Sequence, residues 1–232
     1  MELSEAIKNR RSIRKYTEQP IEFDKLTQVL ESGTYAPSAG NMQNWQFILV
    51  TEKPILKELY EHCLRQEVVY HAQAAIVVCG RIDKAERMYG LRGKRLYTVQ
   101  NCACAVQNML LTAHDLGLGA CWIGAFDEDK ISMMFEIPAI ARPQAIITLG
   151  YPAENPESHR KDIEHFVGFN KYGFKIKDVH LFMRDYSVEW EKQIKKTGEA
   201  SEKGFNRFKE KVKIWWKNGP KRKQRSVLEK KK

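Results

Sequence analysis

Residues 97–126 read YTVQNCACAVQNMLLTAHDLGLGACWIGAF, and this stretch decides the fold class. Its first part places apolar side chains at helical spacing and ends before Gly117, which predicts a long helix over residues 97–116. The apolar run that follows predicts a buried strand over residues 119–126. The chain as a whole mixes helices and strands without a regular strand–helix–strand rhythm, so an α+β fold is favoured over a doubly wound sheet.

The flanking sequence predicts the other elements by the same criteria. We expect helices over residues 3–9, from 21 to before Pro37, over 54–63 and over 127–137. We expect buried strands over residues 45–51, 74–80 and 144–152. The turns between them, above all the one around Gly40, are rich in polar side chains.

The positive charge of the chain is unevenly distributed. The formal net charge of +10 would suit nucleic acid or an anionic membrane. However, residues 1–155 carry 17 Lys and Arg against 18 Asp and Glu, whereas residues 156–232 carry 22 against 11. We therefore expect a nearly neutral domain over residues 1–175, followed by a basic, partly helical C-terminal extension over residues 176–232.

Cysteine usage and hydropathy bear on the cellular compartment. The five cysteines are irregularly spaced, and three of them lie in apolar runs, as is typical of buried reduced thiols. No stretch approaches the roughly 18 apolar residues that span a bilayer, and the charged N-terminus does not resemble a secretory signal. These features predict a cytoplasmic protein.

Several common catalytic motifs are missing from the sequence. It contains no P-loop and no nucleophile elbow, and GLGACWIG follows a helix, whereas the dinucleotide fingerprint follows a strand. Cys102 and Cys104 would lie about 200° apart around a helix, and the six histidines lack ligand spacing, so we predict no metal site.

A dense basic cluster interrupts the neutral body near the N-terminus. Residues 9–16 read NRRSIRKY, and four of the eight side chains are cationic. Arg10 and Arg14 are four residues apart, so a helical turn would place them on one face. Guanidinium groups match the oxygens of a phosphate, which makes a phosphorylated ligand one candidate partner.

Four motifs, in this order, resemble the nitroreductase family of flavin enzymes. They are R-R-S-I-R at residues 10–14, A-P-S-A-G-N-x-Q-x-W-x-F at 36–47, Q-N-x-L-L-x-A-x-x-x-G-L-G-x-x-W-I-G at 107–124 and G-Y-P-A-E-x-P at 150–156. The resemblance covers roughly residues 1–170. It implies a three-layer α+β sandwich around a mainly antiparallel sheet, and an intertwined homodimer that holds FMN at its interface.

The resemblance also implies a set of cofactor-binding residues. The phosphate would be held by Arg10, Ser12 and Arg160, with Arg11 close by, and Arg14 would lie near N1 and the C2 carbonyl of the flavin. The ring would be edged by residues of the partner subunit, namely Pro37, Ser38, Asn41 and Gln43. Backbone amides near flavin N5 would come from Trp122, Ile123 and Gly124.

Two positions depart from the family pattern. Asn44 stands where a proline usually precedes the tryptophan, and we expect it to loosen the turn without removing a cofactor contact. Asn101 stands where an acidic residue is common, and it receives no assigned role.

The function implied is that of an FMN-dependent oxidoreductase. NADH or NADPH would reduce the flavin, and an electron-poor acceptor such as a quinone or a nitroaromatic would reoxidise it in a ping-pong cycle, without a catalytic side chain. Related flavin enzymes act as dehalogenases or dehydrogenases, and these reactions are the alternative. Residues 81–97, with six Lys and Arg, are the expected variable segment, either attracting an anionic substrate or forming a solvated face.

The C-terminal extension leaves a further alternative. Phe205, Phe208, Val212 and Trp215 recur at helical spacing among lysines and arginines. Such a helix can bind an anionic membrane or nucleic acid, or pack its aromatic side chains against the partner subunit. We favour packing within a homodimer.

Overall fold

The computed structural model describes residues 1–168, 172–173 and 210. The chain divides into two units, residues 1–158 and residues 159–232. In the second unit the described part contains one short 3₁₀ turn, η3 (Ile163–His165). The predicted domain boundary at residue 175 and the proposed extension over 176–232 fall almost wholly outside the described residues, so both remain predictions.

The first unit is built around a four-stranded antiparallel sheet. Its strands are β1 (Trp45–Val50), β2 (Ala74–Arg81), β3 (Gly119–Ile123) and β4 (Ala141–Gly150). The spatial order is β1-β2-β4-β3, and every neighbouring pair runs antiparallel. The two central strands, β2 and β4, pair through Ile76 and Ile147 near their midpoints.

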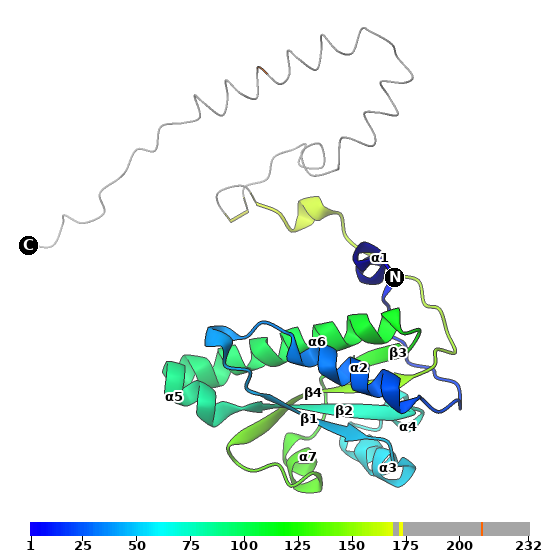
Figure 1. Cartoon of the computed structure of the whole chain (residues 1–232), viewed down its shortest axis with the longest axis horizontal. Coiled ribbons are helices and arrows are strands. Elements are labelled where there is room, and N and C mark those ends of the chain that lie inside the picture. The colour runs from blue at the N-terminus through cyan, green and yellow to red at the C-terminus, as the bar shows by residue number, and fades with distance from the viewer. Residues whose placement is uncertain (169–171, 174–209, 211–232) are drawn as a thin grey trace, which may run out of the picture. The chain divides into compact units, whose positions relative to one another are not determined.

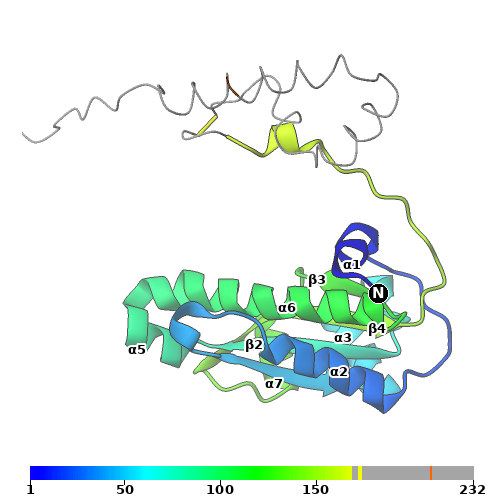
Figure 2. The same cartoon turned by 45° about the horizontal axis from the view of Figure 1, so that its top comes forward.

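Helices cover both faces of this sheet (Figure 1). One face carries α2 (Phe23–Thr34) and α6 (Thr98–Asp115), which lie side by side in Figure 2. The other carries α3 (Lys53–His62), the short α4 (Glu67–Tyr70) and α7 (Glu128–Met134). The predicted three-layer α+β sandwich with an antiparallel sheet is therefore confirmed.

The sequence of strand β2 is a continuous apolar run because both faces of the strand are buried. Side chains alternate between the two faces of a strand. Ile76 and Val78 pack into the core beneath α2 and α6, whereas Val77 and Cys79 pack into the core beneath α3 and α7. Because both faces are covered, polar alternation is absent.

Three strand boundaries differ from those expected, and one of them is the end of β4 at Gly150, two residues before the predicted end. Strand β3 ends at Ile123, and four residues later the Asp127 side chain accepts a hydrogen bond from the Lys130 amide and caps α7. Strand β4 begins at Ala141, earlier than expected, and includes Pro143. Pro143 is tolerated because the register with β2 shifts at Val78/Cys79, where a residue without an amide hydrogen can be accommodated.

The segment expected to be variable is mostly helical. Helix α5 (Ile82–Arg92) leads into a π-helical turn, η2 (Gly93–Tyr97), which continues into α6. Gly90 interrupts α5 with φ 59° and ψ −149°, a conformation open essentially to glycine alone. No described helix is long and apolar enough to cross a membrane.

Candidate functional site

The basic cluster lies in non-helical chain beside the sheet. Helix α1 (Leu3–Asn9) ends immediately before Arg10, whose ψ of 130° leaves the helix. Ser12 then bridges to Ala120 of β3. The expectation that Arg10 and Arg14 share a helical turn is therefore wrong.

Backbone hydrogen bonds fasten this basic segment, residues 10–17, at both of its edges. The Ile13 amide donates to the Ala120 carbonyl at 3.0 Å, and the Ala153 amide donates to the Lys15 carbonyl at 2.9 Å. Two glycines of the sheet permit the close approach. A Cβ added to Gly119 would lie 2.8 Å from Ile13 Cβ, and one added to Gly150 would lie 2.6 Å from Tyr16 Cγ.

A cavity of about 800 Å³ opens beside the basic segment. Its size is within the range of small-molecule sites. The lining residues come from the basic segment, from α4 and its flanks, from β3 and from the turn after β4: Arg14, Lys15, Tyr16, Gln66, Glu67, Val68, His71, Cys121, Trp122, Ile123 and Ala153. The structure thus brings three predicted residues together, Arg14, Trp122 and Ile123, and Trp122 is 40% exposed.

Several of these lining residues were not anticipated. Gln66 donates through Nε2 to the carbonyls of Cys63 and Ala125, both at 2.8 Å, and so ties α4 to the turn after β3. His71 Nε2 lies 3.4 Å from Glu67 Oε2. A helix of four residues gives almost no periodic signal, so only the tertiary fold reveals that α4 reaches the cavity.

The arginines give this end of the sheet a positive potential. Burial lowers the pKa of His114, and the nearby cations Arg10 and Arg11 lower it further. Burial raises the pKa of the Cys121 thiol, while Arg14 and Arg10 oppose that rise. Such a potential favours an anionic group, as a phosphate would be.

One carboxylate moderates that potential. Glu154 Oε1 accepts a hydrogen bond of 2.6 Å from the Arg14 backbone amide. The acidic side chain therefore positions the basic segment and reduces its net charge.

The other predicted residues form a second group, residues 37–43, which we call the edge loop. It contains a 3₁₀ turn, η1 (Ala39–Asn41). The Gln43 amide donates to Ser38 Oγ at 3.0 Å, and Gln43 Nε2 donates to Asn41 Oδ1 at 2.8 Å. The three polar side chains predicted here thus form one local cluster.

The edge loop and the basic segment lie at opposite ends of the sheet. Trp45, just after the edge loop, pairs with Gly80 at the end of β2. Ala120, the partner of Ser12, pairs with Leu149, which pairs with Ala74 at the start of β2. Figure 1 shows the same separation between α1 and the α5 end. One chain therefore does not assemble both groups into a single site.

Asn44 does not loosen the turn, contrary to expectation. Its side chain is fully buried, and its Oδ1 accepts a hydrogen bond of 2.7 Å from Asn101 Nδ2. The two departures from the family pattern therefore contact each other.

Two further residues that were predicted to bind the cofactor belong neither to the cavity lining nor to the edge loop. Gly124 follows β3 and is not part of the cavity lining. Arg160 is an exposed residue of the second unit, so its assignment to a phosphate remains a prediction.

The fold and the cavity define an α+β protein with a cationic small-molecule pocket at a sheet edge. Comparison with known families gives a more specific result. Residues 7–151 match the Nitroreductase family. The chain belongs to the nitroreductase family.

Relatives with assigned names support this membership. A protein of Methanothermobacter thermautotrophicus, whose name pairs NADH dehydrogenase with NAD(P)H nitroreductase, is 39% identical over 160 residues. The alignment covers 67% of this chain and 80% of that protein. The FMN reductase (NADPH) of Bacillus subtilis is 24% identical over 199 residues, covering 78% of this chain and 79% of the relative.

Solved structures share the fold. A nitroreductase from Desulfovibrio desulfuricans in complex with FMN matches with a TM-score of 0.64 and 30% identity, over 74% of this chain and 98% of that one. A nitroreductase family protein from Clostridium difficile matches with a TM-score of 0.66 and 31% identity, over 74% and 99%.

Proposed function

We propose that this protein is an FMN-dependent NAD(P)H oxidoreductase. The observation that carries the proposal is the cavity in which Arg14 meets Trp122 and Ile123, beside the positively charged segment that begins at Arg10. Relatives named for NAD(P)H and FMN, and a structural neighbour in complex with FMN, support the same cofactors for this chain.

In this proposal each group of residues has a binding task. Arg10 and Ser12 hold the phosphate, with Arg11 close by, and the assignment of Arg160 to the same phosphate stays a prediction. Arg14 lies beside the electron-accepting part of the ring, where a cation stabilises negative charge. Backbone amides of residues 122–124 line the edge of the ring. When bound, FMN would supply hydride transfer at N5 between NAD(P)H and an electron-poor acceptor such as a quinone or a nitroaromatic.

The proposal includes a homodimer. Pro37, Ser38, Asn41 and Gln43 lie at the far end of the sheet from Arg14, so a second copy of the chain supplies them to the same flavin. The protein acts in the cytoplasm. Dehalogenation and substrate dehydrogenation are the alternative reactions for the same bound cofactor. Binding of a membrane or of nucleic acid was predicted for the C-terminal extension, which lies outside the described residues.

The first test is the absorbance spectrum of the purified protein. We expect a yellow protein that releases about one FMN per chain on heat denaturation and is bleached by NADH or NADPH without oxygen. Arg14→Gln should weaken FMN binding, whereas Lys57→Gln, on the exposed surface of α3, should leave it unchanged. A colourless protein that fails to bind added FMN would show that the proposed function is wrong.

A further inference from the structure

Three polar side chains are buried where the edge loop meets the start of α6. Asn44 and Thr98 are fully buried, and Asn101 is 3% exposed. Buried amides destabilise a fold unless their donors and acceptors are satisfied. We therefore expect each of these buried polar side chains to have hydrogen-bond partners that stabilise it.

Every contact of the Asn101 amide is directional. Its Oδ1 accepts a hydrogen bond of 2.9 Å from the Ala39 backbone amide in the edge loop. Its Nδ2 donates to Asn44 Oδ1 at 2.7 Å. Because a backbone amide can only donate, the orientation of the Asn101 side chain is determined.

The Asn44 amide continues the network onto β2 and α6. Its Nδ2 donates to the Arg81 carbonyl at 2.9 Å and lies 3.2 Å from Thr98 Oγ1. Thr98 Oγ1 in turn donates to the Gly93 carbonyl at 3.1 Å. The Asn44 side chain, directly after the edge loop, is thus linked to β2 and α6, and through Thr98 to η2.

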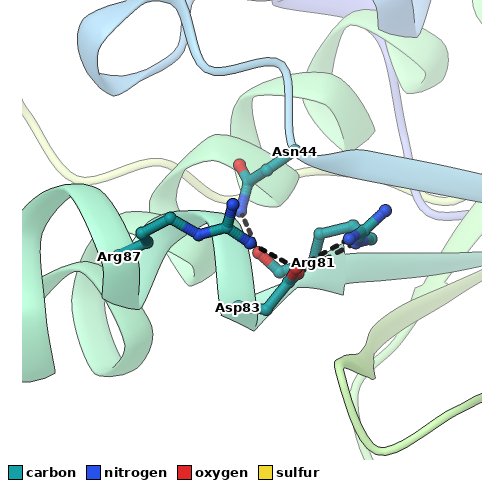
Figure 3. A network of polar contacts seen from close by, with 4 residues as sticks. All are labelled: Asn44, Arg81, Asp83 and Arg87. Atoms are coloured by element: carbon teal, nitrogen blue, oxygen red, sulfur yellow. Dashed lines mark hydrogen bonds and ion pairs between the residues drawn. The ribbon is translucent and has the colours of Figure 1, made fainter.

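Arg81 connects this network to the start of α5 (Figure 3). Its guanidinium donates to both carboxylate oxygens of Asp83, at 2.9 and 2.7 Å, and Arg87 Nη2 lies 3.4 Å from Asp83 Oδ2. The Arg81 backbone amide donates to the Asn44 carbonyl at 2.6 Å. Asn44 is therefore bonded to a residue whose guanidinium is itself held by Asp83 in a charge-assisted pair.

The edge loop needs such support because its backbone is strained. Gly40, Asn41 and Gln43 all have positive φ, at 56°, 53° and 47°. Non-glycine residues reach this region at a cost, so they persist only where surrounding contacts hold them.

We propose that Asn44 and Asn101 are positioning residues that hold the edge loop in the shape in which it meets the flavin. The inference rests on the proposed function, which places Ser38, Asn41 and Gln43 against the cofactor of the partner subunit. Neither asparagine touches the flavin in this proposal. Asn101 acts through the Ala39 amide, and Asn44 acts by fixing the Asn101 amide.

The test compares two asparagines of the same helix. Asn101→Ala removes the acceptor for Ala39, whereas Asn108→Ala, the matched control, removes a hydrogen bond of 3.1 Å to the Ser32 carbonyl of α2. Both variants should lose thermal stability. Only Asn101→Ala should raise the dissociation constant for FMN, by about tenfold, and alter the visible circular dichroism of the bound flavin.

A second readout needs no flavin. Hydrogen exchange at the Ala39 amide in the cofactor-free protein should accelerate about tenfold or more in Asn101→Ala and remain at the wild-type rate in Asn108→Ala. Asn101→Asp keeps the acceptor for Ala39 but loses the donor to Asn44, so its exchange rate and FMN affinity should lie between those of the wild type and Asn101→Ala.

The outcomes separate this inference from the proposed function. A wild-type protein that binds no FMN contradicts the proposed function, and with it the role of the edge loop. A wild-type protein that binds FMN, together with an Asn101→Ala variant whose FMN affinity matches that of Asn108→Ala, overturns the positioning role alone. Unchanged exchange at Ala39 also overturns it.

Discussion

The hydroxyl of Tyr16 lies 2.8 Å from the hydroxyl of Thr148, inside the core beneath the sheet. Tyr16 also donates to the Ile13 carbonyl at 2.8 Å, and either hydroxyl can supply the hydrogen of the bond between Tyr16 and Thr148. A residue of the basic segment is thereby bonded to the central strand β4. The position of the cationic side chains depends on a buried contact between residues 132 apart in the chain.

Tyr16→Phe tests the strength of this attachment. The variant removes the hydroxyl and leaves the ring, so we expect a loss of about 1–2 kcal/mol in the free energy of unfolding, the usual effect of an unpaired buried partner. Denaturant titration measures it. Tyr35→Phe, at an exposed position, is the control and should change stability little. Equal stability of the two variants would contradict the attachment.

Buried thiols predict a loss of stability at alkaline pH. Burial raises the pKa of Cys63 and of Cys102 to about 12 and that of Cys79 to about 11, from an ordinary value of 9.0. A pKa raised by folding means that the stability is fully present below pH 9 and is lost as the pH rises toward the folded-state value. The loss should be about 1.4 kcal/mol per pH unit for each thiol.

The variant Cys63→Ala checks the origin of that slope. It should reduce the dependence of the unfolding free energy on pH between 9 and 11. Val69→Ala, in the same core, should lower stability equally at every pH and leave the slope intact. If Cys63→Ala leaves the slope of the unfolding free energy against pH unchanged, the pH dependence arises from other groups.

Glu154 should have two opposing effects on anion binding. Glu154→Gln keeps a carbonyl oxygen for the Arg14 amide but removes a negative charge from the positive end of the sheet, so FMN should bind several-fold more tightly at low salt. Glu154→Ala loses the acceptor as well, so binding should be weaker than in Glu154→Gln. Fluorescence quenching titrations at low and high salt separate the two effects, and identical affinities would refute this account.

Gly40 should tolerate a side chain only when Tyr89 is shortened. A Cβ at Gly40 would lie only 2.3 Å from the Tyr89 hydroxyl oxygen, and the φ of 56° adds backbone strain. Gly40→Ala should cost about 2 kcal/mol or more, and adding Tyr89→Phe should recover the steric part while about 1 kcal/mol of strain remains. Additive effects in thermal unfolding would show that the Tyr89 hydroxyl does not cause the steric part of the loss.

Much of the secondary structure could be predicted because its signals are local. Helix α1 begins and ends at the predicted residues, and β1, β2 and α6 agree within a residue at each end. Periodicity and helix-stop residues carry this information. Helix α5 was missed because Gly90 breaks it and few of its side chains are buried, so its apolar pattern is weak.

The candidate site was predicted in part. Arg14, Trp122 and Ile123 line one cavity, as predicted. Three further lining residues were not predicted, because the helix α4 is too short to show a periodic pattern: Gln66, Glu67 and His71. The prediction that a helical turn places Arg10 and Arg14 on one face was wrong. The helix ends before Arg10, and the chain then bridges to β3 at Ser12.

The amino-acid sequence by itself determined the α+β class, most element positions, the neutral body and the motifs that indicate the family. Only the tertiary structure decided which distant residues come together. Tyr16 is bonded to Thr148, Asn44 is bonded to Asn101, and Arg14 lines the same cavity as Trp122. The physical reason is that helix and strand preferences depend on neighbours along the chain. Contacts between elements depend instead on the order β1-β2-β4-β3 and on the packing of helices against both faces.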